Sequence, residues 1–113
     1  MRYWTVDEAR AYLPRVRELL ADIRGVAVAV TRAPGNGHGP VGTAGQVKAA
    51  LVELEEGDIV LRDAEEALID FPARGADGVI YYLCWKEGEA DLAFWHLPED
   101  GFAGRRPLPR GPE

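Results

Sequence analysis

Residues 57–107 read GDIVLRDAEEALIDFPARGADGVIYYLCWKEGEADLAFWHLPEDGFAGRRP, and this stretch decides the fold. It contains four short runs of β-forming residues, at 59–62, 68–71, 79–86 and 91–97, separated by acidic and glycine-rich turns. Because the connections are short, the simplest arrangement of these strands is an antiparallel meander. The stretch therefore predicts the sheet of the molecule, and the remaining residues have to cover it.

The first third of the chain predicts helices. Thr5 and Glu8 have the spacing of a capping box, in which a hydroxyl and a carboxylate satisfy two free backbone N–H groups. Pro14 has no amide hydrogen and disfavours helix at the residue before it. We therefore expect a short helix over about residues 6–12 and a long helix over about residues 14–32, with Pro14 in its first turn.

The middle of the chain predicts a loop followed by a helix. Residues 33–45 are rich in glycine and should form a flexible loop, with His38 exposed to solvent. This loop lacks the Gly-Lys-Ser/Thr ending of a phosphate-binding loop and follows no strand. An apolar stripe then predicts a helix over about residues 44–56, with Gly57 as its C′ residue.

These elements predict a single α+β domain over residues 1–113, with a loose tail at 108–113. Two main helices and a short N-terminal helix should pack on a meander of three to four strands.

Composition limits the possible functions. The net charge of −6 argues against a nucleic-acid partner and against anionic membranes. A single cysteine excludes an internal disulfide and a multi-cysteine metal site, and it fits a reducing, cytoplasmic compartment. The sequence has no secretory signal, no apolar run of membrane-spanning length and no recognisable cofactor motif. We therefore expect a cytoplasmic protein without a cofactor.

The faces of the predicted sheet indicate self-association. A tight turn at Gly88 would place Tyr81 and His96 on one face, and Cys84 and Trp95 on the other. Both faces are largely apolar, and the two helices can cover only one. A homodimer would cover the second face. The C-terminal tail or the short N-terminal helix are the alternative covers.

One end of the sheet collects candidate ligand-binding residues. Asp70 and His96 should lie about 10 Å apart across one intervening strand, with Tyr81 between them. Arg105 can fold back toward this end, so we expect these four residues around one surface depression. The alternative is a structural polar network that fixes the sheet edge. A metal at Asp70 and His96 stays open, although two ligands fall short of the three that catalytic zinc usually has.

The opposite end of the sheet collects a second cluster. Asp63, Trp85, Glu87 and Glu89 should lie near one another, and clustered carboxylates can bind a hard cation through oxygen. The alternative for this cluster is a solvated acidic hairpin. Cys84 is interpreted as a small core residue.

Several motifs together resemble a known family. GDIVLRD, LIDFPA, YLCWKEGE, FWH and GFAGRRP resemble an uncharacterised prokaryotic family, domain of unknown function 2203 (DUF2203), and TVDEARAYLPRVRELL is similar to its opening helix. The resemblance implies a small bacterial or archaeal cytosolic protein with no assigned activity. It draws attention to a set of residues without giving them roles: Asp70, Phe71, Pro72, Cys84, Trp85, Gly88, Glu89, Trp95, His96, Gly104 and Arg105.

Two functions of different classes therefore stay open. The first is a self-associating binding module that uses the Trp and Tyr side chains of the sheet surface. The second is a metal-dependent or small-molecule enzyme with its site around Asp70 and His96. A stoichiometric metal would favour the second function. The residues do not decide whether the protein is an enzyme, and they name no substrate.

Overall fold

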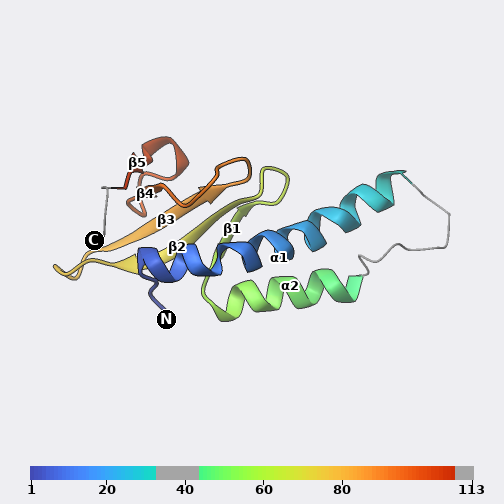
Figure 1. Cartoon of the computed structure of the whole chain (residues 1–113), viewed down its shortest axis with the longest axis horizontal. Helices are drawn as coiled ribbons and strands as arrows, with labels where there is room; N and C mark the ends of the chain where they lie inside the picture. The colour runs from blue at the N-terminus through green and yellow to red at the C-terminus, as the bar shows by residue number, and fades with distance from the viewer. Residues whose placement is uncertain (33–43, 109–113) are drawn as a thin grey trace.

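The computed structural model describes residues 1–32 and 44–108, with side chains in the first segment described as far as Arg24. These residues form two helices and one antiparallel sheet (Figure 1). The α+β class and the antiparallel meander are confirmed, with five strands instead of three to four. The elements in chain order are α1 (Val6–Arg32), α2 (Ala44–Glu56), β1 (Val60–Asp63), β2 (Leu68–Arg74), β3 (Ile80–Lys86), β4 (Phe94–His96), the 3-10 turn η1 (Phe102–Gly104) and β5 (Arg106–Pro107).

Helix α1 runs without interruption through Pro14, where a break or a kink was expected, so the separate short helix and the break are wrong. The capping box is present, because Thr5 and Glu8 each accept a hydrogen bond from the other's backbone N–H. Proline inside a helix costs about 3 kcal/mol. Leu13 and Val16, on either side of Pro14, are both buried in the core. Burial of one such side chain stabilises by about 1.5–3 kcal/mol, so a continuous buried stripe offsets the local cost.

Helix α2 has the predicted bounds but a different C-terminal cap. Asp58, not Gly57, adopts the left-handed conformation, with φ of 57°. The Ile59 N–H then donates to the Leu54 carbonyl at 3.0 Å, as in a Schellman motif. A Cβ at Gly57 would lie 3.1 Å from the Trp4 ring, so a larger residue there would press against that ring.

The register of β2 and β3 separates their residues into two faces. Asp70 pairs with Cys84, while Phe71 pairs with Leu83. Successive side chains of a strand point to opposite faces, so Asp70 and Cys84 share one face and their apolar neighbours share the other.

The register of β4 differs from the predicted one. Cys84 pairs with Phe94 and Tyr82 pairs with His96, so His96 lies on the face of Asp70 and Cys84 and not on that of Tyr81. The predicted pairing of odd with even positions is wrong because the connection is longer than a tight turn. Strand β4 begins only at Phe94, which leaves residues 87–93 as the loop.

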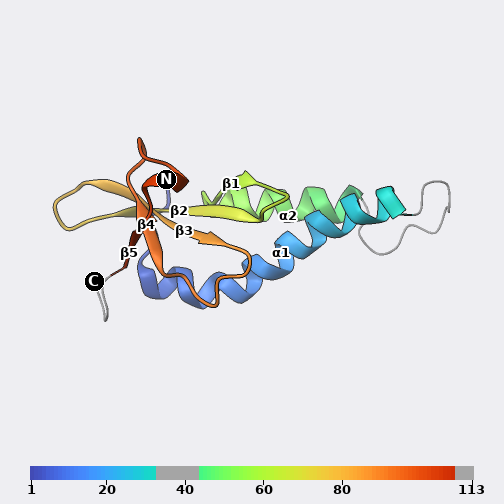
Figure 2. The ribbon, with the colours of Figure 1, turned by 90° about the horizontal axis from the view of Figure 1, so that it is seen from above.

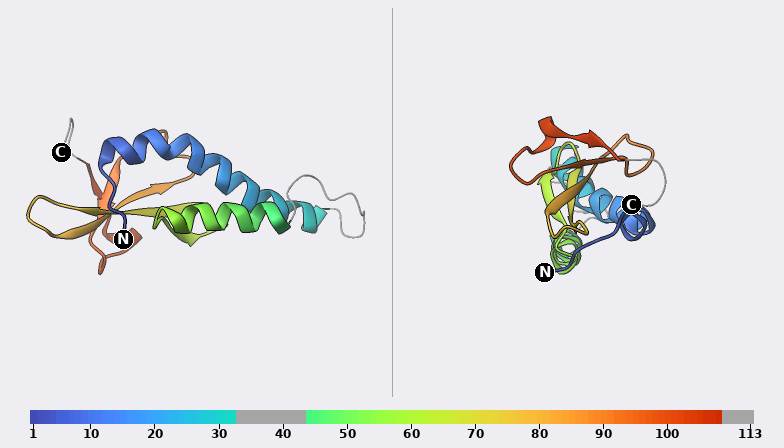
Figure 3. Two further views of the ribbon diagram at one scale, coloured as in Figure 1. Left: turned by 90° about the horizontal axis from the view of Figure 1, so that it is seen from below. Right: turned by 90° about the vertical axis from the view of Figure 1, so that its left-hand side faces the viewer.

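The two helices cover one face of the sheet, and η1 lies on the opposite side (Figure 3). Figure 2 shows β4 and β5 crossing β2 and β3 at a steep angle, so the sheet is strongly twisted. The core between helices and sheet is apolar, and Trp4 packs edge-on against Phe71 at 5.2 Å between ring centroids. Its main sheet residues are Ile69, Phe71, Ala73, Leu83 and Trp85, and its main helix residues are Leu13, Val16, Leu19, Leu20, Ala50 and Leu54.

The C-terminal segment adds the fifth strand, because β5 pairs with β4. Leu108, predicted to belong to a loose tail, donates its N–H to the Ala93 carbonyl at 2.8 Å. The rest of that tail and most of the predicted 33–45 loop, including His38, lie outside the described residues. Within the described ranges, neither helix has the length and apolar character needed to cross a bilayer.

Candidate functional site

The face of the sheet that points away from the helices carries a buried polar cluster. Asp70 and His96 are the buried polar residues of the described chain, with 1% and 2% of their surface exposed, and Cys84 beside them is 1% exposed. Each of these three residues presents one potential ligand atom within 4.8 Å of the other two. Buried charges are costly unless they are paired or bind a metal, so the cluster needs a physical account.

One oxygen of the Asp70 carboxyl contacts two side chains, those of Arg62 and His96. Its Oδ2 atom accepts a hydrogen bond from Arg62 Nε at 2.8 Å and lies 3.0 Å from His96 Nε2. Arg62 comes from the edge strand β1, and its guanidinium also lies over the Tyr82 ring. The hydrogen bond to Asp70 raises the pKa of Arg62, which therefore stays charged.

The imidazole of His96 has an acceptor at each nitrogen. Its Nδ1 atom lies 2.8 Å from the Leu97 carbonyl, which can only accept, so Nδ1 carries a proton. At Nε2 the partner is the Asp70 carboxyl. Either Nε2 is protonated and Asp70 is ionised, or Asp70 is protonated and Nε2 has a free lone pair. Both arrangements place a single proton between the two side chains.

The second oxygen of Asp70 has no such partner. The Oδ1 atom is buried and has no hydrogen-bond partner in the described chain. Burial first, and then the charge of Asp70, raise the pKa of the Cys84 thiol to about 12. The thiol also interacts with the Asp70 carboxyl, which adds to that shift, without a contact to Oδ1 that meets hydrogen-bond geometry. Cys84 is therefore a protonated, poorly nucleophilic thiol in this state.

Arg105 covers the cluster from the C-terminal segment. Its guanidinium donates to both oxygens of Glu89, at 2.7 and 2.5 Å, and lies between the Phe94 and Phe102 rings. The charge of Arg105 lowers the pKa of Cys84, against the larger effects of burial and Asp70, so it acts on the cluster. Its Nε atom is buried without a partner.

The structure brings together some of the predicted ligand-binding residues. Asp70 and His96 are in direct contact, and Arg105 lies nearby but is paired with Glu89. Tyr81 is on the other face, where its ring packs edge-on against Trp95 at 5.8 Å. The predicted depression with Tyr81 at its floor is therefore wrong, because the residues opposite Asp70 and His96 on β3 are Cys84 and Tyr82.

Tyr81 instead lines a separate pocket of about 520 Å³ near the start of α1. Thr5, Asp7 and Arg74 contribute to the same pocket. This pocket is distinct from the buried cluster, since it lies on the face of the sheet that the helices cover.

The four residues of the second predicted cluster do not converge on one point. Glu87 pairs with Arg24, and Glu89 pairs with Arg105. Asp63 Oδ1 accepts a hydrogen bond from the backbone of the following turn. Trp85 is buried and donates its indole N–H to the Glu89 carbonyl at 3.0 Å. Each carboxylate has its own partner, so these groups leave no shared oxygen site.

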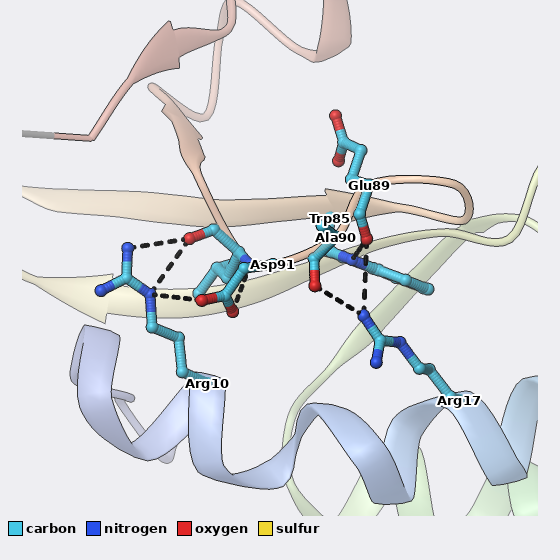
Figure 4. Close-up of polar contacts among 7 residues, drawn as sticks. Arg10, Arg17, Trp85, Glu89, Ala90 and Asp91 are labelled. Carbon is cyan, nitrogen blue, oxygen red and sulfur yellow. Dashed lines mark hydrogen bonds and ion pairs between the residues drawn. The ribbon is translucent and has the colours of Figure 1, made fainter.

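Two arginines of α1 hold the loop at residues 87–93 (Figure 4). Arg10 donates to the Leu92 carbonyl, and Arg17 donates to the Glu89 and Ala90 carbonyls. Figure 4 shows the Glu89 side chain pointing away from α1 while its carbonyl faces Arg17. The loop therefore links the helix layer to Arg105 on the opposite face.

Sequence reasoning missed Arg62, Cys84, Arg10 and Arg17. A signal existed for Cys84, because the hairpin between two alternating runs allows a register that sets it opposite Asp70. Arg10 and Arg17 are seven residues apart, which places them on the same side of a helix. No sequence pattern indicated what that side would meet.

Comparison with known proteins identifies the family. The model of the family described as Uncharacterized conserved protein (DUF2203) matches residues 42–108. The match spans α2 and the whole sheet, including the buried cluster, and excludes α1. No curated protein and no solved structure matches the chain. Because the match covers more than half of the residues, the chain belongs to this family.

Proposed function

We propose that this member of the DUF2203 family binds one divalent transition-metal ion, with Zn²⁺ as the best-suited ion. The ligands would be Asp70 Oδ1, Cys84 Sγ and His96 Nε2. The observation that carries the proposal is the buried Asp70 Oδ1 atom, which has no partner and belongs to a cluster with a thiol and an imidazole. A metal ion supplies the missing positive partner.

The chemistry of the three donors favours zinc over hard cations. Thiolate and imidazole suit zinc and related transition metals, whereas Ca²⁺ and Mg²⁺ prefer sites made of oxygen alone. Three protein ligands with a fourth position left for another ligand is the pattern of catalytic zinc sites. The sequence indicated only Asp70 and His96, and Cys84 completes the set of three.

The spacing of the cluster is close to that of a tetrahedral site. Zinc bonds of about 2.0–2.3 Å place ligand atoms roughly 3.3–3.8 Å apart. One carboxylate oxygen of Asp70, the Cys84 sulfur and one ring nitrogen of His96 lie within 4.8 Å of one another, so a contraction of about 1 Å is required. The Leu97 carbonyl already orients the His96 ring through Nδ1, as second-shell partners of metal-bound histidines do.

Self-association through an aromatic sheet surface is the alternative function. The aromatic side chains offer it less surface than the sequence predicted, because Trp4 and Trp85 are buried and Tyr81 packs on Trp95. Arg105 and η1 also cover part of the face that a second chain was expected to cover. A purely structural polar network of Arg62, Asp70 and His96 is the other alternative.

Calorimetric titration of metal-stripped, tag-free protein with Zn²⁺ in a competing chelator tests the proposal. One Zn²⁺ should bind per chain. Asp70→Asn, Cys84→Ala and His96→Gln should each weaken binding by more than the 10- to 100-fold that loss of a second-shell partner costs. Asp63→Asn and Glu87→Gln are matched controls, because Asp63 ends β1 and Glu87 follows β3, both outside the cluster, and they should leave affinity unchanged.

Two results would reject the metal site. One is substoichiometric binding by the wild-type chain. The other is Zn²⁺ affinity that survives Cys84→Ala in a variant whose circular dichroism spectrum is native. A monomer–dimer equilibrium that persists in all three ligand variants would instead favour self-association.

A further inference from the structure

Two buried atoms of opposite character remain without partners beside Cys84. Among the described residues, Asp70 Oδ1 and Arg105 Nε are the buried side-chain polar atoms that lack a hydrogen-bond partner. The first is an acceptor and the second is a donor. A buried polar group without a partner destabilises the fold, so each of these two atoms points to a complementary group that binds it.

A metal ion satisfies only the first of these atoms. The donor at Arg105 Nε requires an acceptor, and a cation offers none. Arg105 is 11% exposed and is fixed by Glu89 and two aromatic rings, so it cannot turn its Nε atom to solvent without breaking these contacts. The complementary group for this atom is a hydrogen-bond acceptor, and the charge of the site indicates which kind.

The net charge of the metal-loaded cluster indicates that this acceptor is an anion. Asp70 and a Cys84 thiolate balance the two charges of the metal, and His96 binds as a neutral ring. Glu89 balances Arg105. Arg62, paired with the carboxylate that would bind the metal, then leaves one uncompensated positive charge. The Arg62 side chain is 42% exposed, so water screens part of this charge, and one monovalent anion at the metal compensates the rest.

We infer that the metal-loaded site binds a small monovalent anion, such as a monocarboxylate, as the fourth metal ligand. The inference rests on the proposed metal site. Arg62 supplies the charge that favours the anion, and Arg105 Nε supplies the hydrogen bond. Burial of the three metal ligands restricts the anion to a few heavy atoms. Arg62 is thus a specificity-determining residue: it disfavours the bare metal ion and favours the metal together with an anion.

Substitution of the metal with Co²⁺ provides the test, because the visible spectrum of cobalt responds to a change of its fourth ligand. The full-length Co²⁺-loaded chain is titrated with sodium formate at constant ionic strength, held with sodium perchlorate. A saturable spectral change in the millimolar range or below is expected. Formate binding should weaken roughly 10- to 100-fold in Arg62→Met, the size expected for one charge a few ångströms away.

Matched variants separate charge from structure. Arg62→Lys keeps the charge and should retain formate binding within about threefold of wild type. Arg62→Met should bind Co²⁺ more tightly than wild type in the absence of formate, a gain that a merely structural role of Arg62 would not produce. Arg105→Lys, which removes the Nε donor and keeps the charge, should weaken formate binding.

The outcomes distinguish this inference from the metal site. Failure of the wild-type chain to bind stoichiometric Co²⁺ overturns both. Stoichiometric Co²⁺ with a spectrum that formate does not alter overturns the anion alone. Equal formate affinity in wild type and Arg62→Met also overturns it, because the charge of Arg62 is then irrelevant.

Discussion

The two faces of β2 and β3 are built from alternate residues of the same strands, yet different interactions stabilise them. On the helix side, Phe71 and Leu83 are fully buried among apolar side chains. On the other side, Asp70 and Cys84 are buried equally deeply among charged and polar groups. The first face stabilises the fold through the area it removes from water. The second gains little from burial and depends on pairing, since an imperfectly paired buried charge reduces stability.

The difference indicates where function is located. Two apolar side chains at the positions of Asp70 and His96 would give a fold of equal or greater stability, because replacing buried ion pairs by well-packed apolar groups is often neutral or stabilising. Buried polar groups with an unpartnered oxygen are therefore the part of the sheet that stability alone does not explain.

The largest effect is expected from the apolar face. Phe71→Ala should lower the free energy of unfolding by about 3–5 kcal/mol, because the ring is fully buried against Trp4 and the helices. Urea unfolding followed by tryptophan fluorescence measures this change. A loss below about 1 kcal/mol would mean that the helix layer does not pack on this face as described.

A smaller loss is expected from the polar face. Asp70→Asn in the metal-free protein should cost about 2–3 kcal/mol, below the 3–5 kcal/mol typical of a broken buried pair, because Arg62 is 42% exposed and can turn to solvent. The same urea experiment gives this value. If saturating Zn²⁺ stabilised the variant as much as it stabilises wild type, Asp70 would not be a ligand.

The smallest effect is expected for a charge pair outside both faces. A hydrogen bond from Arg15, and then one from Tyr12, lower the pKa of Glu53 from 4.5 to about 2. The stability that this carboxylate contributes is therefore present above pH 4.5 and is lost as the pH falls toward 2. Melting temperatures of wild type and Glu53→Gln across this range should converge at the acid end.

The size of the stability difference at neutral pH distinguishes an exposed ion pair from a buried one. The difference between wild type and Glu53→Gln at neutral pH should be smaller than the effect of Asp70→Asn, since exposed ion pairs contribute little. A larger difference would show that the link from Glu53 to Arg15 matters more to the packing of α2 on α1 than burial suggests.

The alternation of side chains along β2 and along β3 was predictable because it is local, but the pairing of the two strands was not, since Asp70 was expected beside Tyr81 and pairs with Cys84. Asp70 stands between two apolar residues, and Cys84 does the same on the neighbouring strand. The register of β4 could not be obtained in this way. It depends on the loop at residues 87–93, which Arg10, Arg17 and Arg105 hold from elements distant in sequence.

The candidate site was predictable only in part for the same reason. Proximity of Asp70 and His96 followed from strand order, but their direct contact follows from the shifted register of β4. Tyr81 was expected beside both residues, but the β2–β3 register puts it on the other face from Asp70, and the β4 register puts it on the other face from His96. At Pro14, a local rule predicted a helix break, and burial of the residues on both sides prevented it.

X-ray absorption spectroscopy of the Zn²⁺-loaded chain tests the central claim most directly, because it identifies the atoms bound to the metal. One sulfur at about 2.3 Å, with nitrogen and oxygen at about 2.0–2.2 Å in a four-coordinate shell, is the predicted result. The sulfur contribution should disappear in Cys84→Ala. A shell of oxygen and nitrogen alone in the wild-type protein would contradict the assignment of Asp70, Cys84 and His96 as a metal site.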